Sequence, residues 1–313
     1  MKTQRNQTGR QNHLIFRRPP GALLLHFILF SLLILPPACL ITSCDRPEVI
    51  APPQENQDIF VPVDSTRYTV YFNNLGPVPE NTEGWRLDLF VYDADGVREL
   101  QYRSSVKGLP DSLVFKGPER MLTAVAIANS PLTINPNAVL RYDSIELLTY
   151  SFIDDNPARP IMSGSCNIEP GSPCKIDLSP LMARVTLAEV YNTMKGYVRL
   201  EDPRIWLENR NSSAEVLRFA GFRPSELLQD KEELKLPFDI GFFKQNPMAT
   251  LYCYPNDAPE SSVGNPATEF VFACEINGET CNFKVKLPPV RRNSETFVDL
   301  TVNGKDSFES KCY

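Results

Sequence analysis

The chain has 313 residues, of which 22% are charged, and its formal net charge is −6 at pH 7. An acidic balance disfavours nucleic-acid binding, which needs clustered lysine and arginine side chains facing phosphates, so we expect no nucleic-acid partner. The length suits one large domain or two ordinary ones.

The first 43 residues are organised like an export signal. Five basic and no acidic residues precede or flank an apolar run at 22–35. That run is about 14 residues long, whereas a permanent membrane-spanning helix needs ~20. Pro36 and Pro37 then end it. The alternative is a short uncleaved anchor or a buried core helix.

The segment Leu40-Ile41-Thr42-Ser43-Cys44 resembles the lipobox of bacterial lipoproteins. In those proteins the cysteine thiol is acylated and the chain is cut before it. The resemblance implies a signal peptide at 1–43 and lipidation of Cys44. Cleavage would remove five of the 32 basic residues and none of the 38 acidic ones, which leaves a net charge of −11. Such a charge disfavours docking on anionic lipid, so the acyl chains would hold the protein to the membrane.

Residues 44–63 contain four prolines and predict an extended tether. An N-terminal β-rich domain is predicted at 64–165. Aromatic, β-branched and apolar runs predict its strands at 67–72, 85–92, 97–102, 113–115 and 121–128. Asp95-Gly96 predicts a hairpin turn, and the nearly continuous apolar run at 121–128 predicts a strand buried on both faces. One helix is predicted at 143–150, with Asp143 as its cap.

Four prolines and two glycines at 154–173 place the predicted domain boundary near residue 165. The second domain, 166–313, again consists mainly of predicted strands, at 174–191 with a break at Pro180, 197–208, 250–254, 269–276, 281–287 and 296–302. Asn277-Gly278 predicts a second hairpin turn, and 224–236 predicts a helical insertion. Many short strands separated by Gly, Pro and Asn turns favour a pair of antiparallel sandwiches.

Eight cysteines are present; Cys39 lies in the leader and Cys44 is the lipid site. The other six are Cys166, Cys174, Cys253, Cys274, Cys281 and Cys312. An even count in an exported protein favours disulfides, for which six cysteines allow fifteen pairings. The short turn-rich loop between Cys166 and Cys174 makes these two the first candidate pair; buried free thiols are the alternative. A zinc site is disfavoured, because no CxxC pair occurs and both histidines precede Cys44.

The same lack of histidine argues against an enzyme. No general-base histidine remains after the predicted cut, and no GxSxG, GxGxxG or GxxxxGK[ST] motif occurs, so we expect neither catalysis nor a cofactor. Asp93-Ala94-Asp95-Gly96 resembles the start of a calcium loop, but the later oxygen ligands do not follow, which favours a turn. Asp154-Asp155 is interpreted as a solvated loop. Trp85 and Trp206 are interpreted as core residues rather than sugar platforms.

Three Asp-Ser triplets begin at Asp64, Asp111 and Asp143. They resemble the O-glycosylation sequon of secreted Bacteroidales proteins, which makes Ser65, Ser112 and Ser144 candidate modification sites. Asp143-Ser144 is equally suited to cap a helix.

Together, the lipobox, the tether and the two β-rich halves resemble the fimbrillin-type lipoproteins of Bacteroidales, especially the fimbrial anchor subunits (FimB-like). The resemblance is carried by 85–96 (WRLDLFVYDADG), an apolar strand followed by aromatic-Asp-x-x-Gly. Three further segments, 121–129, 183–187 and 296–302, are similar to strands of that family. The one functional residue that the resemblance transfers is Cys44.

The resemblance implies an all-β fold of two tandem transthyretin-like or Ig-like antiparallel sandwiches after the signal peptide and tether. It also implies a surface-exposed outer-membrane lipoprotein that serves as anchor or accessory subunit of a fimbrium. A stalk subunit would join by strand addition, because an open sheet edge offers unpaired N–H and C=O groups. Arg67 is the only basic residue between Asp64 and Arg86, so a processing site is lacking there and a fixed base is favoured.

The alternative function is a surface lipoprotein that binds a glycan or a host protein for a nutrient-uptake system. An exposed aromatic pair would favour this alternative.

Overall fold

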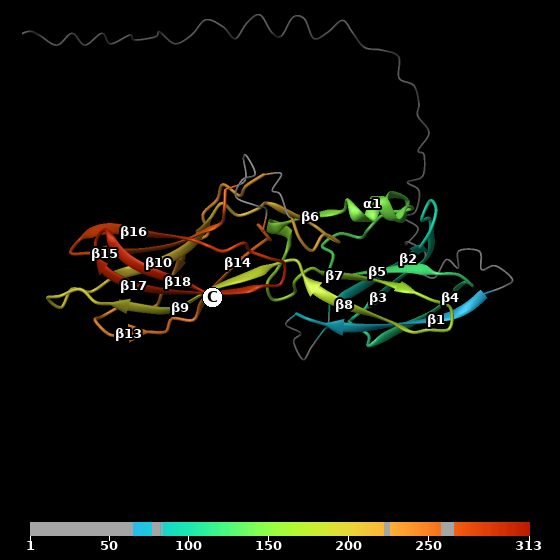
Figure 1. Cartoon of the computed structure of the whole chain (residues 1–313), viewed down its shortest axis with the longest axis horizontal. Helices are drawn as coiled ribbons and strands as arrows, with labels where there is room; N and C mark the ends of the chain where they lie inside the picture. Colours follow the sequence, from blue (N-terminus) through green and yellow to red (C-terminus); the bar gives the residue numbers. More distant parts are fainter. Residues whose placement is uncertain (1–64, 77–81, 83, 222–225, 258–265) are drawn as a thin grey trace, which may run out of the picture. The chain divides into compact units, whose positions relative to one another are not determined.

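The computed structural model describes residues 65–76, 82, 84–221, 226–257 and 266–313, all within one compact unit. The predicted signal peptide (1–43), the lipidation site Cys44 and the tether (44–63) lie outside the described residues. Strands dominate the described part of the chain, as the sequence predicted (Figure 1).

The first half forms a seven-stranded sheet with the order β3-β2-β5-β7-β8-β1-β4. Its strands are β1 (Ser65–Asn74), β2 (Arg86–Asp93), β3 (Leu100–Lys107), β4 (Ser112–Pro118), β5 (Leu122–Ala128), β7 (Met162–Ile168) and β8 (Cys174–Pro180). Strands β7 and β8 pair only at Met162–Pro180 and Ser163–Ser179. A side chain at Gly164 would clash with the Asp177 carbonyl, so glycine permits this close approach.

Beyond that contact the sheet separates into two layers, β2, β3, β5 and β7 against β1, β4 and β8. Fifteen buried residues fill the space between them, with Tyr68, Leu87, Leu89 and Phe115 among the largest. The layers make a sandwich in which β1 and β8 run parallel while the other pairs are antiparallel.

The second half forms another sandwich. One sheet has the order β12-β10-β15-β16, and the other has β13-β9-β17-β18 with β14 also paired to β9. The strands are β9 (Ala183–Asn192), β10 (Glu201–Glu208), β12 (Leu234–Lys235), β13 (Lys244–Gln245), β14 (Ala249–Cys253), β15 (Glu269–Ile276), β16 (Glu279–Lys286), β17 (Glu295–Gly304) and β18 (Ser307–Cys312). Strand β16 shows why these segments form strands, because Cys281, Phe283 and Val285 face the core and alternate with exposed residues. Strands β9 and β17 are the parallel pair here.

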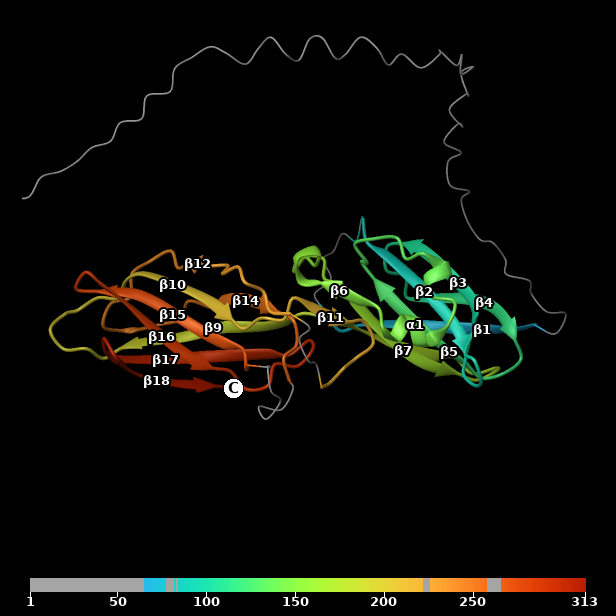
Figure 2. The same ribbon diagram turned by 90° about the horizontal axis from the view of Figure 1, so that it is seen from above.

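Short elements cover the outer face of β2 and β5 and join the two halves. They are η1 (Pro136–Ala138), α1 (Tyr142–Glu146), β6 (Thr149–Ser151), η2 (Phe152–Asp154) and β11 (Ser213–Glu215). Strand β6 pairs with β11, which comes from the second half (Figure 2). A third core cluster lies here and takes Phe90 and Ile127 from the first half and Val216 and Tyr254 from the second.

Most predicted strands are present, and all seven residues of β5 are buried, as its apolar run predicted. One helix prediction is confirmed only in part, and the other is wrong. The helix at 143–150 is a single turn, α1, whose N-cap is Arg141, and Leu147 and Leu148 lie beyond its end. Residues 226–236 contain no helix, because this segment pairs instead along the edge of β10.

The predicted boundary at residues 165 and 166 falls inside β7. Strands β7 and β8 both belong to the first sheet, and the second sandwich begins with β9 at Ala183. The division of the chain into two domains stays a prediction.

Candidate functional site

The three candidate glycosylation serines differ in exposure. Ser65 and Ser112 begin β1 and β4 and are half-buried, whereas Ser144 is exposed on α1. Modification of each serine stays a prediction, and Ser144 is the most accessible of the three.

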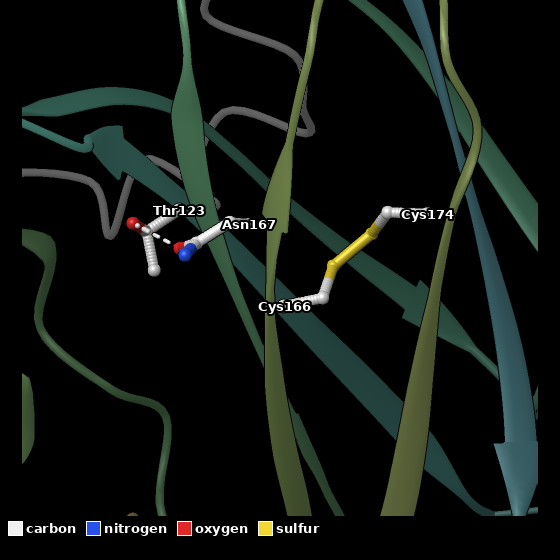
Figure 3. The surroundings of a disulfide bond; sticks show 4 residues. All are labelled: Thr123, Cys166, Asn167 and Cys174. Atoms are coloured by element: carbon white, nitrogen blue, oxygen red, sulfur yellow. Dashed lines mark hydrogen bonds between the residues drawn. A yellow bond between two sulfur atoms is a disulfide. The ribbon is translucent and has the colours of Figure 1, made fainter.

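Cys166 of β7 and Cys174 of β8 are joined by a disulfide, with their Cα atoms 6.6 Å apart. The bridge links the two layers of the first sandwich at the point where β7 and β8 have separated (Figure 3). Beside it, the Thr123 hydroxyl donates to the Asn167 side-chain oxygen at 3.0 Å, which ties β5 to β7. This site is structural.

The other residues considered from sequence are also structural. Asp93 pairs with Arg120 at 2.7 Å and accepts a hydrogen bond from Gln101, which fits a turn rather than a calcium loop. Trp85 and Trp206 are buried, as predicted. The interpretation of Asp154-Asp155 as a solvated loop is right for Asp154, which is exposed, and wrong for Asp155. Asp155 is buried and accepts from the Ile161 N–H at 2.8 Å, because the chain folds back over it.

The open edges of the second sandwich are suited to binding another chain. On one side, the edges of β16 and β18 flank a hollow of 420 Å³, the β16–β18 groove, lined by residues 279–283 together with Lys305, Asp306 and Phe308. Charged side chains line this side, and Lys305 pairs with Glu279. Charges of this kind discourage strand pairing at an edge.

The opposite side carries the larger and more apolar opening, the β10–β14 groove of 550 Å³. It lies between the edge of β10 and the edge of β14, and β14 pairs only with β9 among the described strands. Its apolar walls come from Met182, Leu207, Leu228, Leu234 and Leu251. An apolar side chain that entered here would extend the core of the sandwich.

The backbone of β10 is only partly covered on this side. Leu236 donates its N–H to the Pro203 carbonyl at 2.9 Å, and β12 pairs with the next two residues. Residues 229–233 then leave the strand and pair with no other strand. Pro203 and Ile205 direct their backbone groups toward this edge, where Leu236 and β12 bond to them. Alternate residues of a strand direct their N–H and C=O groups to the same side, so Leu207 presents its backbone toward the groove.

The rim of the β10–β14 groove is polar. Arg210 is buried, donates to the Asp230 carbonyl at 2.9 Å and pairs with the exposed Glu232 at 3.3 Å. Its guanidinium lies 5.3 Å from the centre of the Phe152 ring. Asp155 also lines the groove, and burial raises its pKa to about 6. The site therefore combines an apolar floor, an open strand edge and fixed polar groups.

A second surface feature is an exposed aromatic cluster formed by Tyr197, Phe242 and Phe243. The exposed fractions of these side chains are 82%, 40% and 69%. Tyr197 contacts Phe242 edge-on with ring centres 5.3 Å apart, and Phe242 contacts Phe243 at 4.9 Å. Sequence reasoning missed this cluster, because its members come from two loops more than forty residues apart.

In the part of the chain that the structure describes, no group of three His, Cys, Asp or Glu side chains is placed to hold a metal ion. Within the same residues, no helix is long and apolar enough to cross a membrane.

No family model and no curated protein sequence matches the chain. Solved structures do match. A candidate cell adhesion protein from Bacteroides eggerthii has a TM-score of 0.59 at 12% identity, over 81% of this chain and 96% of that chain. A fimbrilin from Porphyromonas gingivalis has a TM-score of 0.54 at 13% identity, over 79% and 96%. The tip fimbrial protein Mfa3 of the same species has a TM-score of 0.53 at 11% identity, over 80% and 98%.

At such low identity these matches establish the fold. The chain has the β-sandwich fold of Bacteroidales fimbrial and cell adhesion proteins.

Proposed function

We propose that the chain is a non-enzymatic outer-membrane lipoprotein of the fimbrillin type that serves as anchor or accessory subunit of a fimbrium. The observation that carries the proposal is the fold, which matches fimbrial subunits over about four-fifths of this chain and nearly all of theirs. The lipobox supports the membrane attachment, which would run through acylated Cys44.

The proposed role as the fixed base of the fimbrium follows from lipid attachment at the amino terminus. A subunit whose amino terminus carries lipid cannot pass that terminus to the next subunit, so growth of the fimbrium would stop at it. A FimB-like anchor role is therefore favoured over a role at the fimbrial tip.

The β10–β14 groove is the proposed binding site for the neighbouring subunit. A donor strand would pair with the exposed backbone at Leu207 or with the free edge of β14. Its alternate apolar side chains would enter the space between Leu207 and Leu251. Residues 229–233 form no strand pairing that the donor must break, and a shift of this segment would release the contacts of Arg210 with Asp230 and Glu232.

A charge placed in the groove tests this assignment. Leu234 lines the groove and is 37% exposed, so Leu234→Asp should leave the fold intact. It should nevertheless oppose burial of an apolar donor, since an unpaired carboxylate is costly to desolvate. We expect the amount of fimbrial subunits that co-purify with the detergent-solubilised full-length protein to fall about tenfold, which corresponds to about 1.4 kcal/mol of binding free energy.

The matched control is Leu147→Asp, which adds the same charge at a leucine that is 75% exposed beyond α1. Recovery should equal that of the unsubstituted protein. If Leu234→Asp binds subunits as well as this control, the groove is not the site. If neither protein recovers a fimbrial subunit, the functional proposal fails.

The exposed aromatic cluster favours the second candidate function, a surface lipoprotein that binds a glycan or host protein for nutrient uptake. Aromatic faces left in water can stack on sugar rings or anchor a protein interface. Tyr197→Ala with Phe243→Ala should then abolish binding on an array of bacterial and host glycans. Tyr71→Ala, at a tyrosine of β1 that is 48% exposed, is the control. No binding by the unsubstituted protein would remove the glycan version of this candidate.

A further inference from the structure

Two of the unpaired cysteines face each other across neighbouring strands. In the hairpin of β15 and β16, Cys274 lies directly opposite Cys281. The turn Asn277-Gly278 fixes this register, because both residues have positive φ and form a two-residue loop between Ile276 and Glu279. A slip of the register by one residue would turn every core side chain of β16 outward, so the pairing is well determined.

The separation of the two Cα atoms lies within the range that a disulfide can bridge. A two-residue loop makes Ile276–Glu279 a hydrogen-bonded pair, and alternation along the ladder makes Cys274–Cys281 the next pair of that type. Such pairs have Cα atoms roughly 5.5 Å apart, near the separation most common in disulfides. The bonded pair Cys166–Cys174 is wider, at 6.6 Å.

Both side chains also lie on the same face of the sheet. Cys274 is 2% exposed and Cys281 is 8% exposed, and both belong to the core of the second sandwich. The remaining free cysteines have no such partner. Cys253 lies opposite Ala183, and Cys312 lies opposite Val298.

From this register we propose that Cys274 and Cys281 form a second disulfide, which staples the β15–β16 hairpin. The inference is independent of the fimbrial role, because it uses only the pairing of the two strands and their shared face.

An oxidant in solution can reach one of the two thiols from the protein surface. Cys281 lines the open β16–β18 groove beside Lys305, whereas Cys274 lies deeper. Burial raises the pKa of the Cys281 thiol, and the Lys305 ammonium opposes that rise. Burial raises the pKa of Cys274 to about 12. Cys281 is therefore the thiol that reacts first.

The reaction is thiol–disulfide exchange with a disulfide oxidant. The Cys281 thiolate attacks one sulfur of the oxidant, forms a mixed disulfide and releases the other sulfur as a thiolate. The Cys274 thiolate then attacks the Cys281 sulfur and displaces the second sulfur. The protein loses two protons and two electrons, and the oxidant takes up both electrons as two thiols. Exchange is fastest before the sandwich closes or when the edge hairpin opens.

The test is a mass measurement on the full-length chain. Reduced protein is treated with oxidised glutathione, blocked with N-ethylmaleimide and cut after glutamate. Cleavage after Glu269, Glu275, Glu279 and Glu295 places the two cysteines on separate peptides, 270–275 and 280–295. We expect these two peptides to be recovered as one linked species that separates on reduction.

Two variants sharpen the result. Cys274→Ser should leave Cys281 as a mixed disulfide with glutathione, whereas Cys312→Ser should still give the linked peptides. Full alkylation of both thiols in the oxidised, unsubstituted protein would overturn the proposal, as would linkage of either to Cys253 or Cys312. The measurement on the unsubstituted chain decides the matter even if a serine variant fails to fold.

Discussion

Arg292 carries a buried positive charge, and within the described residues its hydrogen-bond acceptors are backbone carbonyls and one hydroxyl rather than a carboxylate. The side chain is 7% exposed and lies in the loop between β16 and β17. Its guanidinium donates to the carbonyls of Pro180, Ser163 and Ser179, all in the first sandwich, and to the Val216 carbonyl at 2.7 Å. Burial lowers the pKa of Arg292, and these carbonyl dipoles offset the cost of keeping it charged. One side chain thus links the two halves of the described chain.

Removal of that guanidinium should destabilise the protein strongly. Arg292→Met keeps the stem but leaves several buried carbonyls without a donor, at a cost of about 1–3 kcal/mol for each group that water cannot reach. We expect urea unfolding to show a loss of at least about 2 kcal/mol. Arg291→Met changes the exposed neighbour and should stay within ~0.5 kcal/mol. Equal effects of the two substitutions would show that the buried network does not stabilise the fold.

Asp155 makes stability depend on pH in an unusual direction. Its pKa rises from 3.8 to about 6, chiefly by burial, although the Ile161 N–H and the Tyr254 hydroxyl at 3.1 Å oppose that rise. The folded state therefore holds this proton more tightly than the unfolded state. The associated stability is fully present below pH 3.8 and is lost as pH rises through about 6. The largest possible contribution is about 3 kcal/mol.

Asp155→Asn should flatten this dependence. The amide oxygen can still accept from Ile161, while the ionisable group is gone. Between pH 4 and 7, the free energy of unfolding of the unsubstituted protein should fall more steeply than that of Asp155→Asn. The exposed neighbour gives the control, Asp154→Asn, which should keep the original slope. Parallel slopes for the unsubstituted protein and Asp155→Asn would contradict the assignment.

At the scale of elements, the β15–β16 turn depends on a backbone conformation that glycine favours. Gly278 has φ +77°, and nothing lies within 4 Å of where a Cβ would be. Gly278→Ala should therefore lower stability through backbone strain alone, by about 1–2 kcal/mol. Gly241 is equally open but lacks a positive φ, so Gly241→Ala should not carry this strain. Thermal unfolding of the two variants tests this expectation: a loss of stability in Gly278→Ala alone indicates backbone strain, and equal losses in both would contradict it.

Strands with a strong local pattern could be predicted from the sequence. The apolar run of β5 and the alternation of β16 identify a buried and a half-exposed strand whatever lies around them. Strand β7 (MSGSCNI) could not, because it has no alternating apolar pattern: Ser163 is buried and accepts a hydrogen bond from Arg292, whereas Ser165 and Asn167 are exposed. The segment 226–236 shows the reverse error, where pairing along β10 overrides a helical pattern.

The candidate site was harder to predict than the fold. The family resemblance implied an open edge, but the β10–β14 groove brings together strands that are about forty residues apart and a loop between them. The burial of Arg210 and of Asp155 also depends on tertiary contacts. Local periodicity carries no information about which edges face each other. The pairing of Cys166 with Cys174 could be predicted from the sequence, because the loop between them is short and rich in turn residues.

At the scale of the whole molecule, three parts of the chain would together attach a fimbrium to the cell. A lipid at Cys44 would hold the chain to the outer membrane, residues 44–63 would extend from it, and the sandwiches would receive a neighbour. The acidic balance of the chain fits this arrangement, because it disfavours contact with anionic lipid and leaves attachment to the acyl chains.

The most direct test is to purify the native lipoprotein from detergent-solubilised outer membranes and identify by mass spectrometry the proteins that co-purify. The account predicts fimbrillin-type subunits, and it predicts that Cys44→Ala removes both the protein and these subunits from the membrane fraction. Recovery of a TonB-dependent transporter or glycan-degrading enzymes without any fimbrial subunit would contradict the fimbrial role and support the nutrient-uptake alternative.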